Sequence, residues 1–92
     1  MIKIFRVKGS SMLPNFKSNQ LVLAVKTKNL YVNDVVILST SDSGEIIKRI
    51  SSIEDNHIKV TGDNTEYNSR HYSEIFNTDN VIGKVFFKIS LF

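Results

Sequence analysis

Residues 35–61 read VVILSTSDSGEIIKRISSIEDNHIKVT, and this stretch decides the fold class. Short segments rich in β-branched residues alternate along it with turn-forming residues, a pattern typical of strands joined by tight turns. The segments are 35–39, 45–53 and 57–61, and the turns are Asp42-Ser43-Gly44 and Glu54-Asp55-Asn56. Because such short turns connect antiparallel strands, we expect two consecutive hairpins over about residues 35–61.

Segments of the same kind flank these hairpins. They cover residues 2–7, 20–26 and 81–91, and further turn signals lie at Asn33-Asp34 and Gly62-Asp63-Asn64. Together they predict an all-β fold, a single small domain of bent antiparallel sheets over residues 1–92. At most a helical turn is expected, near residues 72–77.

Length and composition exclude several classes of protein. The chain has 92 residues, 41% of them hydrophobic and 23% charged, which is typical of one globular domain and excludes disordered or collagen-like chains. It has no cysteine, so disulfides, zinc ribbons and thiol redox motifs are excluded. The longest apolar runs, Leu21–Val25 and Val35–Leu38, are far shorter than the roughly 20 residues of a membrane span, and the N-terminus lacks a signal-peptide core. We therefore expect no transmembrane segment and a cytoplasmic protein.

Charge is unevenly distributed along the chain. Residues 1–33 contain six basic residues and no acidic one, whereas residues 34–92 contain six basic and nine acidic residues. A basic N-terminal third could bind an acidic peptide, a membrane surface or nucleic acid. Because the basic residues are scattered among apolar ones, we interpret them as ordinary solvated charge. Basic residues interleaved with exposed aromatic ones are lacking, so no nucleic-acid partner is expected.

The alternation in the last strand predicts which side chains it buries. Val81, Val85, Phe87, Ile89 and Leu91 fall on one face, which we expect to pack in the core. Ile82, Lys84, Phe86, Lys88 and Ser90 fall on the other. Phe86 and Phe92 are expected to form a second buried cluster, with the docking of a partner as the alternative.

Lys48 occupies an unusual position for a lysine. Alternation places it between Ile46 and Ile50, an apolar environment that an ammonium group normally avoids. It is therefore a candidate for an amine with a perturbed pKa. The alternative is that the side chain extends to the edge of the strand, and Arg49, between Ile47 and Ser51, shows that alternation alone does not decide.

Other catalytic or metal-binding patterns are lacking. His57 and His71, the two histidines, have no second ligand at a metal-binding spacing, so no metal or other cofactor is expected and neither histidine is assigned a catalytic role. The sequence has no Gly-x-Ser-x-Gly nucleophile motif and no phosphate-binding loop.

A serine-containing turn precedes the only proline. In Gly9-Ser10-Ser11-Met12-Leu13-Pro14, a permissive glycine and a rigid proline flank the serines, and such a turn between two strands can present a hydroxyl at the edge of the domain. The alternative is a structural loop whose Met12 and Phe16 side chains enter the core.

This turn and the segments after it resemble the ordered boxes of the type I signal peptidase family. Gly9 to Pro14 resembles its Gly-x-Ser-Met-x-Pro box, and three further boxes and the closing strand follow in the family's order. They are Asn33-Asp34-Val35-Val36, Ile47-Lys48-Arg49-Ile50, Gly62-Asp63-Asn64 with Ser69-Arg70 and Tyr72, and Val81-Ile82-Gly83-Lys84-Val85. The resemblance covers about residues 5–88 and implies the fold shared by signal peptidases and repressor C-terminal domains.

The resemblance implies a serine endopeptidase with a Ser-Lys dyad. Ser11 matches the nucleophile because it immediately precedes Met12, and Lys48 matches the general base. A lysine serves as a base only when neutral, and deprotonating an ordinary lysine at pH 7 costs about 4.6 kcal/mol. Burial can lower a lysine pKa by about 3–5 units, so the Ile46 and Ile50 flank is suited to this role.

Supporting roles also follow from the resemblance. The Ser11 N–H would donate to the oxyanion, and the second donor stays open because Gly9 stands where some relatives have a serine. Asp63 could pair with Arg49 or Arg70 and brace the lysine strand. Ser69, ahead of Thr65, would orient the lysine. Met12 and Pro14 are expected to contact substrate.

Among relatives, the chain is most similar to the small nickel-type superoxide dismutase maturation proteases. These are thought to remove a short leader so that the new N-terminus binds nickel, which implies a precursor protein as partner. The alternatives are a signal peptidase domain for secretory leaders, a self-cleaving repressor-like module, and a peptide-binding domain without activity.

Overall fold

The fold is all-β, as predicted. The computed structural model describes residues 1–89, with the backbone alone at Arg70. Its strands are β1 (Ile2–Arg6), β2 (Leu21–Val25), β3 (Val35–Thr40), β4 (Gly44–Glu54), β5 (His57–Thr61), β6 (Phe76–Asn77) and β7 (Val81–Ile89). Two short 3₁₀ helices, η1 (Arg70–Ser73) and η2 (Thr78–Asn80), flank β6. Within residues 1–89, no helix is long and apolar enough to cross a bilayer.

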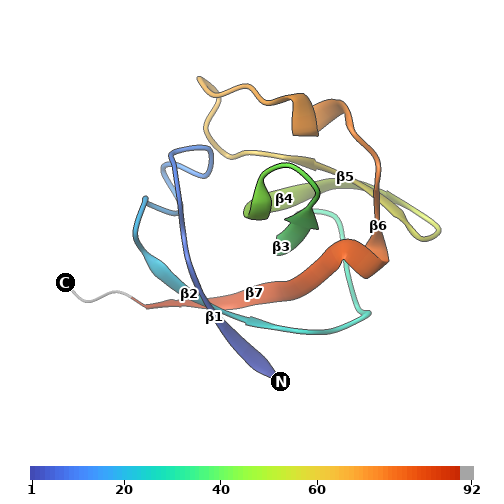
Figure 1. Ribbon diagram of the computed structural model, residues 1–92, viewed down its shortest axis with the longest axis horizontal. Helices are drawn as coiled ribbons and strands as arrows, with labels where there is room; N and C mark the ends of the chain where they lie inside the picture. The colour runs from blue at the N-terminus through green and yellow to red at the C-terminus, as the bar shows by residue number, and fades with distance from the viewer. Residues whose placement is uncertain (90–92) are drawn as a thin grey trace.

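The strands form one antiparallel sheet in the order β1-β2-β7-β3-β4-β5-β6. The two predicted hairpins, β3-β4 and β4-β5, are confirmed. Figure 1 shows the sheet bent around its middle, with β1, β2 and β7 on one side of β3 and with β4 and β5 on the other. The bend brings the β1–β2 connection close to β4 and to the segment after β5.

Strand β3 is buried on both faces because the bent sheet encloses it. Val35 and Ile37 belong to one hydrophobic cluster, whereas Val36 and Leu38 belong to a second. The other buried members of the first cluster are Phe5, Val7, Met12, Phe16, Val22, Ala24 and Ile47. Those of the second are Ile50, Ile58, Val60, Phe76 and Val81. The continuous apolar run of β3 therefore follows from its central position.

The turns use the residues that the sequence suggested. Gly44 adopts φ 67° at the β3–β4 turn and Asp55 adopts φ 55° at the β4–β5 turn. Glycine and aspartate both tolerate this left-handed region. The helical turn expected near residues 72–77 is partly misplaced: η1 ends at Ser73, and Phe76–Asn77 instead pairs with β5 as the short strand β6.

The expected facing of β7 is wrong at Phe87, which is 58% exposed, and at Ile89, which lies on the same outward side. It is also wrong at Ile82, which packs against the first cluster together with Val85 instead of facing away from it. Two register shifts explain the difference. Ile37 and Leu38 of β3 pair with Gly83 and Val81, and Leu23 and Ala24 of β2 pair with Phe87 and Val85, so one residue of β7 is skipped each time. Such a bulge breaks the strict alternation of side chains along a strand.

The second buried cluster expected at Phe86 is also wrong, because that side chain is 52% exposed at one of these bulges. The predictions for Ser90, Leu91 and Phe92 concern positions outside the described residues. The C-terminal half of β7 therefore presents two aromatic rings to solvent.

We predict that Ile37→Ala lowers the free energy of unfolding by about 2–5 kcal/mol, because it removes a fully buried side chain from the central strand. Ile75→Ala is the matched control, since Ile75 is 63% exposed and should change stability by less than about 0.5 kcal/mol. Chemical denaturation measures both. Equal effects would contradict the central position of β3.

Candidate active site

Ser11 lies on a tight turn between β1 and β2. Gly9 adopts φ 80°, and the Leu13 N–H donates to the Ser10 carbonyl oxygen at 3.2 Å. The Met12 side chain is fully buried in the first hydrophobic cluster and anchors the turn. Ser11 is itself 5% exposed, so its hydroxyl points toward the protein rather than into solvent.

Lys48 lies in the middle of β4 opposite Val36 of β3. Cross-strand partners share a face of the sheet, so the lysine stem lies on the side of the second hydrophobic cluster. Its neighbours Ile46 and Ile50 pack in that cluster, as the sequence predicted. The side chain is buried, at 6% exposure, rather than extended to a strand edge.

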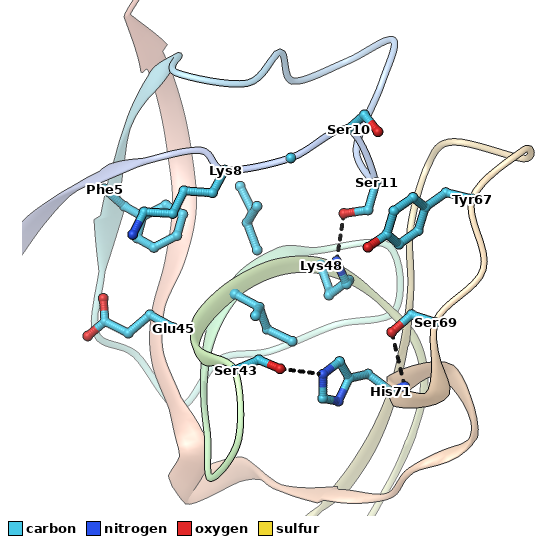
Figure 2. Close-up of a pocket in the computed structure, with 13 residues that line it drawn as sticks. Phe5, Lys8, Ser10, Ser11, Ser43, Glu45, Lys48, Tyr67, Ser69 and His71 are labelled. Carbon is cyan, nitrogen blue, oxygen red and sulfur yellow. Dashed lines mark hydrogen bonds between the residues drawn. The ribbon is translucent and has the colours of Figure 1, made fainter.

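The two side chains meet across the fold. Lys48 Nζ lies 2.6 Å from Ser11 Oγ, within hydrogen-bonding distance, and Figure 2 shows them pointing toward each other. Desolvation by burial lowers the pKa of Lys48 below its ordinary value of 10.5. The predicted approach is therefore present, and burial makes this amine easier to deprotonate than an exposed lysine. A neutral amine can accept the hydroxyl proton, whereas an ammonium can only donate to Oγ.

Tyr67, which the sequence analysis did not single out, covers the amine. Its ring centroid lies 5.7 Å from Lys48 Nζ, and its side chain is on the solvent side, with the residue 42% exposed. Figure 2 shows the ring beside the Ser11–Lys48 contact. The segment after β5 carries no periodic pattern that would have placed this tyrosine there.

The segment Gly62–Asn64 holds the serine turn in place. The Asn64 N–H donates to the Ser11 carbonyl oxygen at 2.9 Å, and its side-chain amide donates to the Ser10 carbonyl oxygen at 3.0 Å. A Cβ atom on Gly62 would lie 2.5 Å from the Ser11 carbonyl oxygen and would also clash with the Tyr72 hydroxyl. Glycine is needed here because two backbone segments approach closely.

Asp63 pairs with Arg49, one of the two partners predicted from sequence. Arg49 Nε and Nη2 donate to the two carboxylate oxygens at 2.7 Å each, and Nη1 donates to the Asn33 carbonyl oxygen at 2.6 Å. Asn15 also donates to Asp63 at 2.8 Å. The Arg49 hydrogen bonds lower the pKa of Asp63 and raise that of Arg49. This pair ties the lysine strand to Asn33 and, through Asn15, to the end of the serine turn.

A cavity of about 460 Å³ opens beside Ser11 and Lys48, and we call it the Ser11 cavity. Its apolar lining comes from Phe5, Ile46 and Ile47, and its polar lining includes Lys8, Glu45, Ser43 and His71. Figure 2 shows Ser11 and Lys48 at one end and Ser43 with His71 at another. The cavity is large enough to accept side chains of a bound peptide next to the hydroxyl.

Of the other residues predicted to support the dyad, two lie in the wall of the Ser11 cavity. Gly9 and Ser69 line the Ser11 cavity. The Gly9 N–H donates to Ser18 Oγ at 3.3 Å, and Ser69 Oγ accepts from the His71 N–H at 3.2 Å. Thr65 is exposed, and the Arg70 side chain lies outside the described residues. That Ser69 orients the lysine stays a prediction.

The prediction that Met12 contacts substrate needs correction. Its side chain is 1% exposed and belongs to the core, because the turn directs it away from the Ser11 cavity. Pro14 is exposed but lines a different hollow, together with Arg6 and Lys17. Both residues shape the serine turn instead of lining the cavity beside it.

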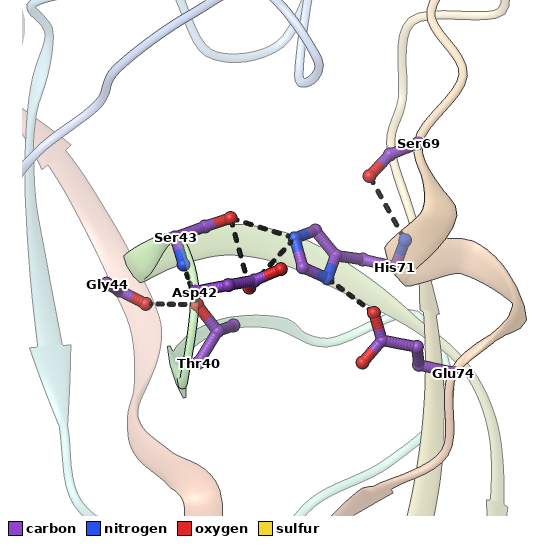
Figure 3. Close-up of polar contacts among 7 residues, drawn as sticks. All are labelled: Thr40, Asp42, Ser43, Gly44, Ser69, His71 and Glu74. Atoms are coloured by element: carbon purple, nitrogen blue, oxygen red, sulfur yellow. Dashed lines mark hydrogen bonds and ion pairs between the residues drawn. The ribbon is translucent and has the colours of Figure 1, made fainter.

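His71 lies in the wall of the Ser11 cavity, although the sequence analysis assigned it no role. The residue is 7% exposed, and its ring has Nδ1 3.0 Å from Glu74 Oε1 and Nε2 3.2 Å from Ser43 Oγ (Figure 3). Asp42 Oδ1 lies 4.0 Å from Nε2. This network joins η1 to the β3–β4 turn and fixes one wall of the cavity. The contact between η1 and the β3–β4 turn joins segments far apart in the sequence, so no local sequence pattern could predict it.

No group of three or more His, Asp or Glu side chains gathers at a possible metal site in the part of the chain that the structure describes. The contacts at Ser11 and Lys48 are instead those of a hydroxyl, an amine and backbone amides.

Comparison with known protein families gives a match over almost the whole chain. The family profile described as Peptidase S24-like matches residues 2–86, from the start of β1 into β7. This span includes both Ser11 and Lys48. No curated protein matches the chain.

We predict that Asp63→Asn lowers the free energy of unfolding by about 1–3 kcal/mol at pH 7, because it weakens a charge-assisted pair with Arg49. The folded-state pKa of Asp63 is lowered, so the carboxylate stabilises the fold above its unfolded pKa of about 3.9. That contribution is lost as the pH falls through the folded-state pKa. Denaturation measured from pH 7 to pH 2 should therefore show the free energies of unfolding of the unchanged protein and Asp63→Asn becoming equal in acid. A difference in free energy that stays constant with pH would contradict the assignment.

Proposed function

Because the chain belongs to the Peptidase S24-like family, we propose that it is a serine endopeptidase with Ser11 as nucleophile and Lys48 as general base. The observation that carries this proposal is the 2.6 Å contact between Lys48 Nζ and Ser11 Oγ at a buried amine. A serine hydroxyl is a weak nucleophile and needs an adjacent base. A lysine can act as this base only when its amine is neutral, and burial lowers the Lys48 pKa in that direction.

The first half of the reaction forms an acyl-enzyme. Lys48 Nζ accepts the Ser11 hydroxyl proton while Oγ forms a bond to the scissile carbonyl carbon of the substrate. The tetrahedral intermediate then collapses, and the Lys48 ammonium returns that proton to the leaving amine as the C–N bond breaks. The ester on Ser11 and a neutral lysine remain.

The second half hydrolyses this ester. Water attacks the acyl carbon, Lys48 accepts a proton from the water, and the same proton passes to Ser11 Oγ as the ester bond breaks. In both halves the Ser11 N–H is the first oxyanion donor, a contact of the kind worth about 3–4 kcal/mol. The bonds from Asn64 to the Ser10 and Ser11 carbonyl oxygens support this role because they fix the orientation of the serine turn.

As substrate we propose a protein precursor with a short N-terminal leader, in particular nickel-type superoxide dismutase. The support is the sequence resemblance to maturation proteases together with the open Ser11 cavity, which can accept an extended peptide. The purified protein should therefore shorten such a precursor at one site, as read by intact-mass spectrometry.

Parallel reactions separate the alternatives. Cleavage of a secretory preprotein instead of the dismutase precursor would indicate a signal peptidase domain. Loss of mass from the chain itself would indicate a self-cleaving module. Binding of precursor without any cleavage would indicate a peptide-binding domain and would contradict the proposed activity.

We predict that Ser11→Ala abolishes cleavage, with a loss of at least about 10³-fold in kcat, because the nucleophile is removed. Ser10→Ala is the matched control, since it changes the neighbouring hydroxyl on the same turn and should keep most activity. Thermal melting checks that both variants fold. The reverse pattern would make Ser10 the nucleophile.

Cleavage should increase with pH through the lowered pKa of Lys48, because only the neutral amine accepts the Ser11 proton. The rising limb of the plot of cleavage rate against pH should lie at a lower pH than the pKa of an ordinary lysine would give. Lys48→Arg should remove activity, since a guanidinium keeps its proton. His57→Ala and His71→Ala should keep the shape of the limb. A limb that disappears with either histidine variant would show that the base is misassigned.

A further inference from the structure

The outward side of β1, β2 and β7 is apolar, although no part of the proposed peptidase mechanism uses it. Its seven apolar residues, which we call the outer apolar face, are Ile2, Ile4, Leu21, Leu23, Val25, Phe87 and Ile89. The strand register places them on one surface: Ile4 pairs with Leu23, which pairs with Phe87. Residues paired across neighbouring strands point to the same side of a sheet.

These side chains are exposed to an unusual degree. Ile2 is 59% exposed, Ile4 63% and Phe87 58%, and the other four are half-buried. The opposite side of the same strands carries the buried Phe5, Val22 and Ala24 of the first cluster. Single exposed apolar residues are common on proteins, but a contiguous apolar surface over three strands is typical of an interaction site.

Charge is segregated in the same way. Residues 1–33 and 81–89, which include all three strands, contain eight of the twelve basic residues and none of the nine acidic ones. All nine acidic residues lie within residues 34–80. Arg6 lies on the outer apolar face opposite Leu21, and Lys26 and Lys28 follow β2; all three are exposed. Two of the eight basic residues are compensated, because Lys3 pairs with Glu45 at 3.5 Å and Lys84 pairs with Asp34 at 3.1 Å. The positive charge beside the apolar surface therefore comes from Arg6, Lys26 and Lys28.

We propose that the outer apolar face docks on an anionic lipid bilayer surface. A bilayer presents acidic headgroups above hydrocarbon, which matches exposed isoleucine and phenylalanine side chains with basic residues beside them. Nucleic acid would pair with the cations but would leave the apolar face without a partner. A second copy of the chain would cover the apolar face but would bring like charges together.

Cosedimentation with vesicles tests this proposal. The protein should bind vesicles of equal parts phosphatidylcholine and phosphatidylglycerol more tightly than vesicles of phosphatidylcholine alone, and high salt should weaken that binding. Ile4→Asn and Phe87→Asn should each weaken it about tenfold. The Lys26→Glu, Lys28→Glu double variant should weaken binding to the anionic vesicles by at least about tenfold. Ile75→Asn, at an equally exposed isoleucine outside this face, should not change binding.

Fluorescence gives a second readout that does not depend on how the asparagine variants fold. The natural chain has no tryptophan, so Phe87→Trp and Ile75→Trp each carry a single reporter. Anionic vesicles should shift the Phe87→Trp emission to shorter wavelength and leave the Ile75→Trp emission unchanged.

Three results would overturn the proposal. They are an absence of binding to anionic vesicles, equal responses of the two tryptophan variants, and a dimer in vesicle-free buffer that Ile4→Asn dissociates. The last would identify a second copy as the occupant. None of these results would bear on cleavage by Ser11, so they remain distinct from a failure of the proposed peptidase activity.

Discussion

The contact between Lys48 and Ser11 is the constraint on which the rest of the site depends. An ammonium group at 6% exposure, flanked by Ile46 and Ile50, is poorly solvated, so burial shifts the amine toward its neutral form. The polar atom 2.6 Å from it is the Ser11 hydroxyl. Burial destabilises the charged form of Lys48, and for the same reason it makes the amine of Lys48 suitable as a base.

The bent sheet makes this contact possible between residues 37 positions apart. Strand β4 fixes the lysine through its register with β3, and the first hydrophobic cluster anchors the serine turn through Met12. The segment after β5 joins the two, because Asn64 binds the turn and Asp63 binds Arg49, the residue after the lysine. A change in any of these elements would move the hydroxyl relative to the amine.

Sequence patterns predicted the features that depend on local periodicity or on ordered motifs. The two central hairpins, the apolar neighbours of Lys48 and the pairing of Asp63 with one of two candidate arginines are of this kind. The exposure of Phe87 could not be predicted, because two bulges in β7 break the alternation that the prediction assumed. Tyr67 and His71 reach the Ser11 cavity from irregular or 3₁₀ segments, whose positions depend on tertiary contacts. Met12 was misassigned because its motif indicates the turn but not the direction of the side chain.

Direct titration of the Lys48 amine tests the central claim. With ¹⁵N- and ¹³C-labelled lysine, NMR can follow each of the nine lysines in the protein as the pH increases. Assignment of the Lys48 signal rests on its loss in Lys48→Arg. We predict that Lys48 loses its proton at a distinctly lower pH than the other eight. Titration of Lys48 together with the exposed lysines would contradict the account, because the amine would then be charged when the Ser11 hydroxyl needs a base.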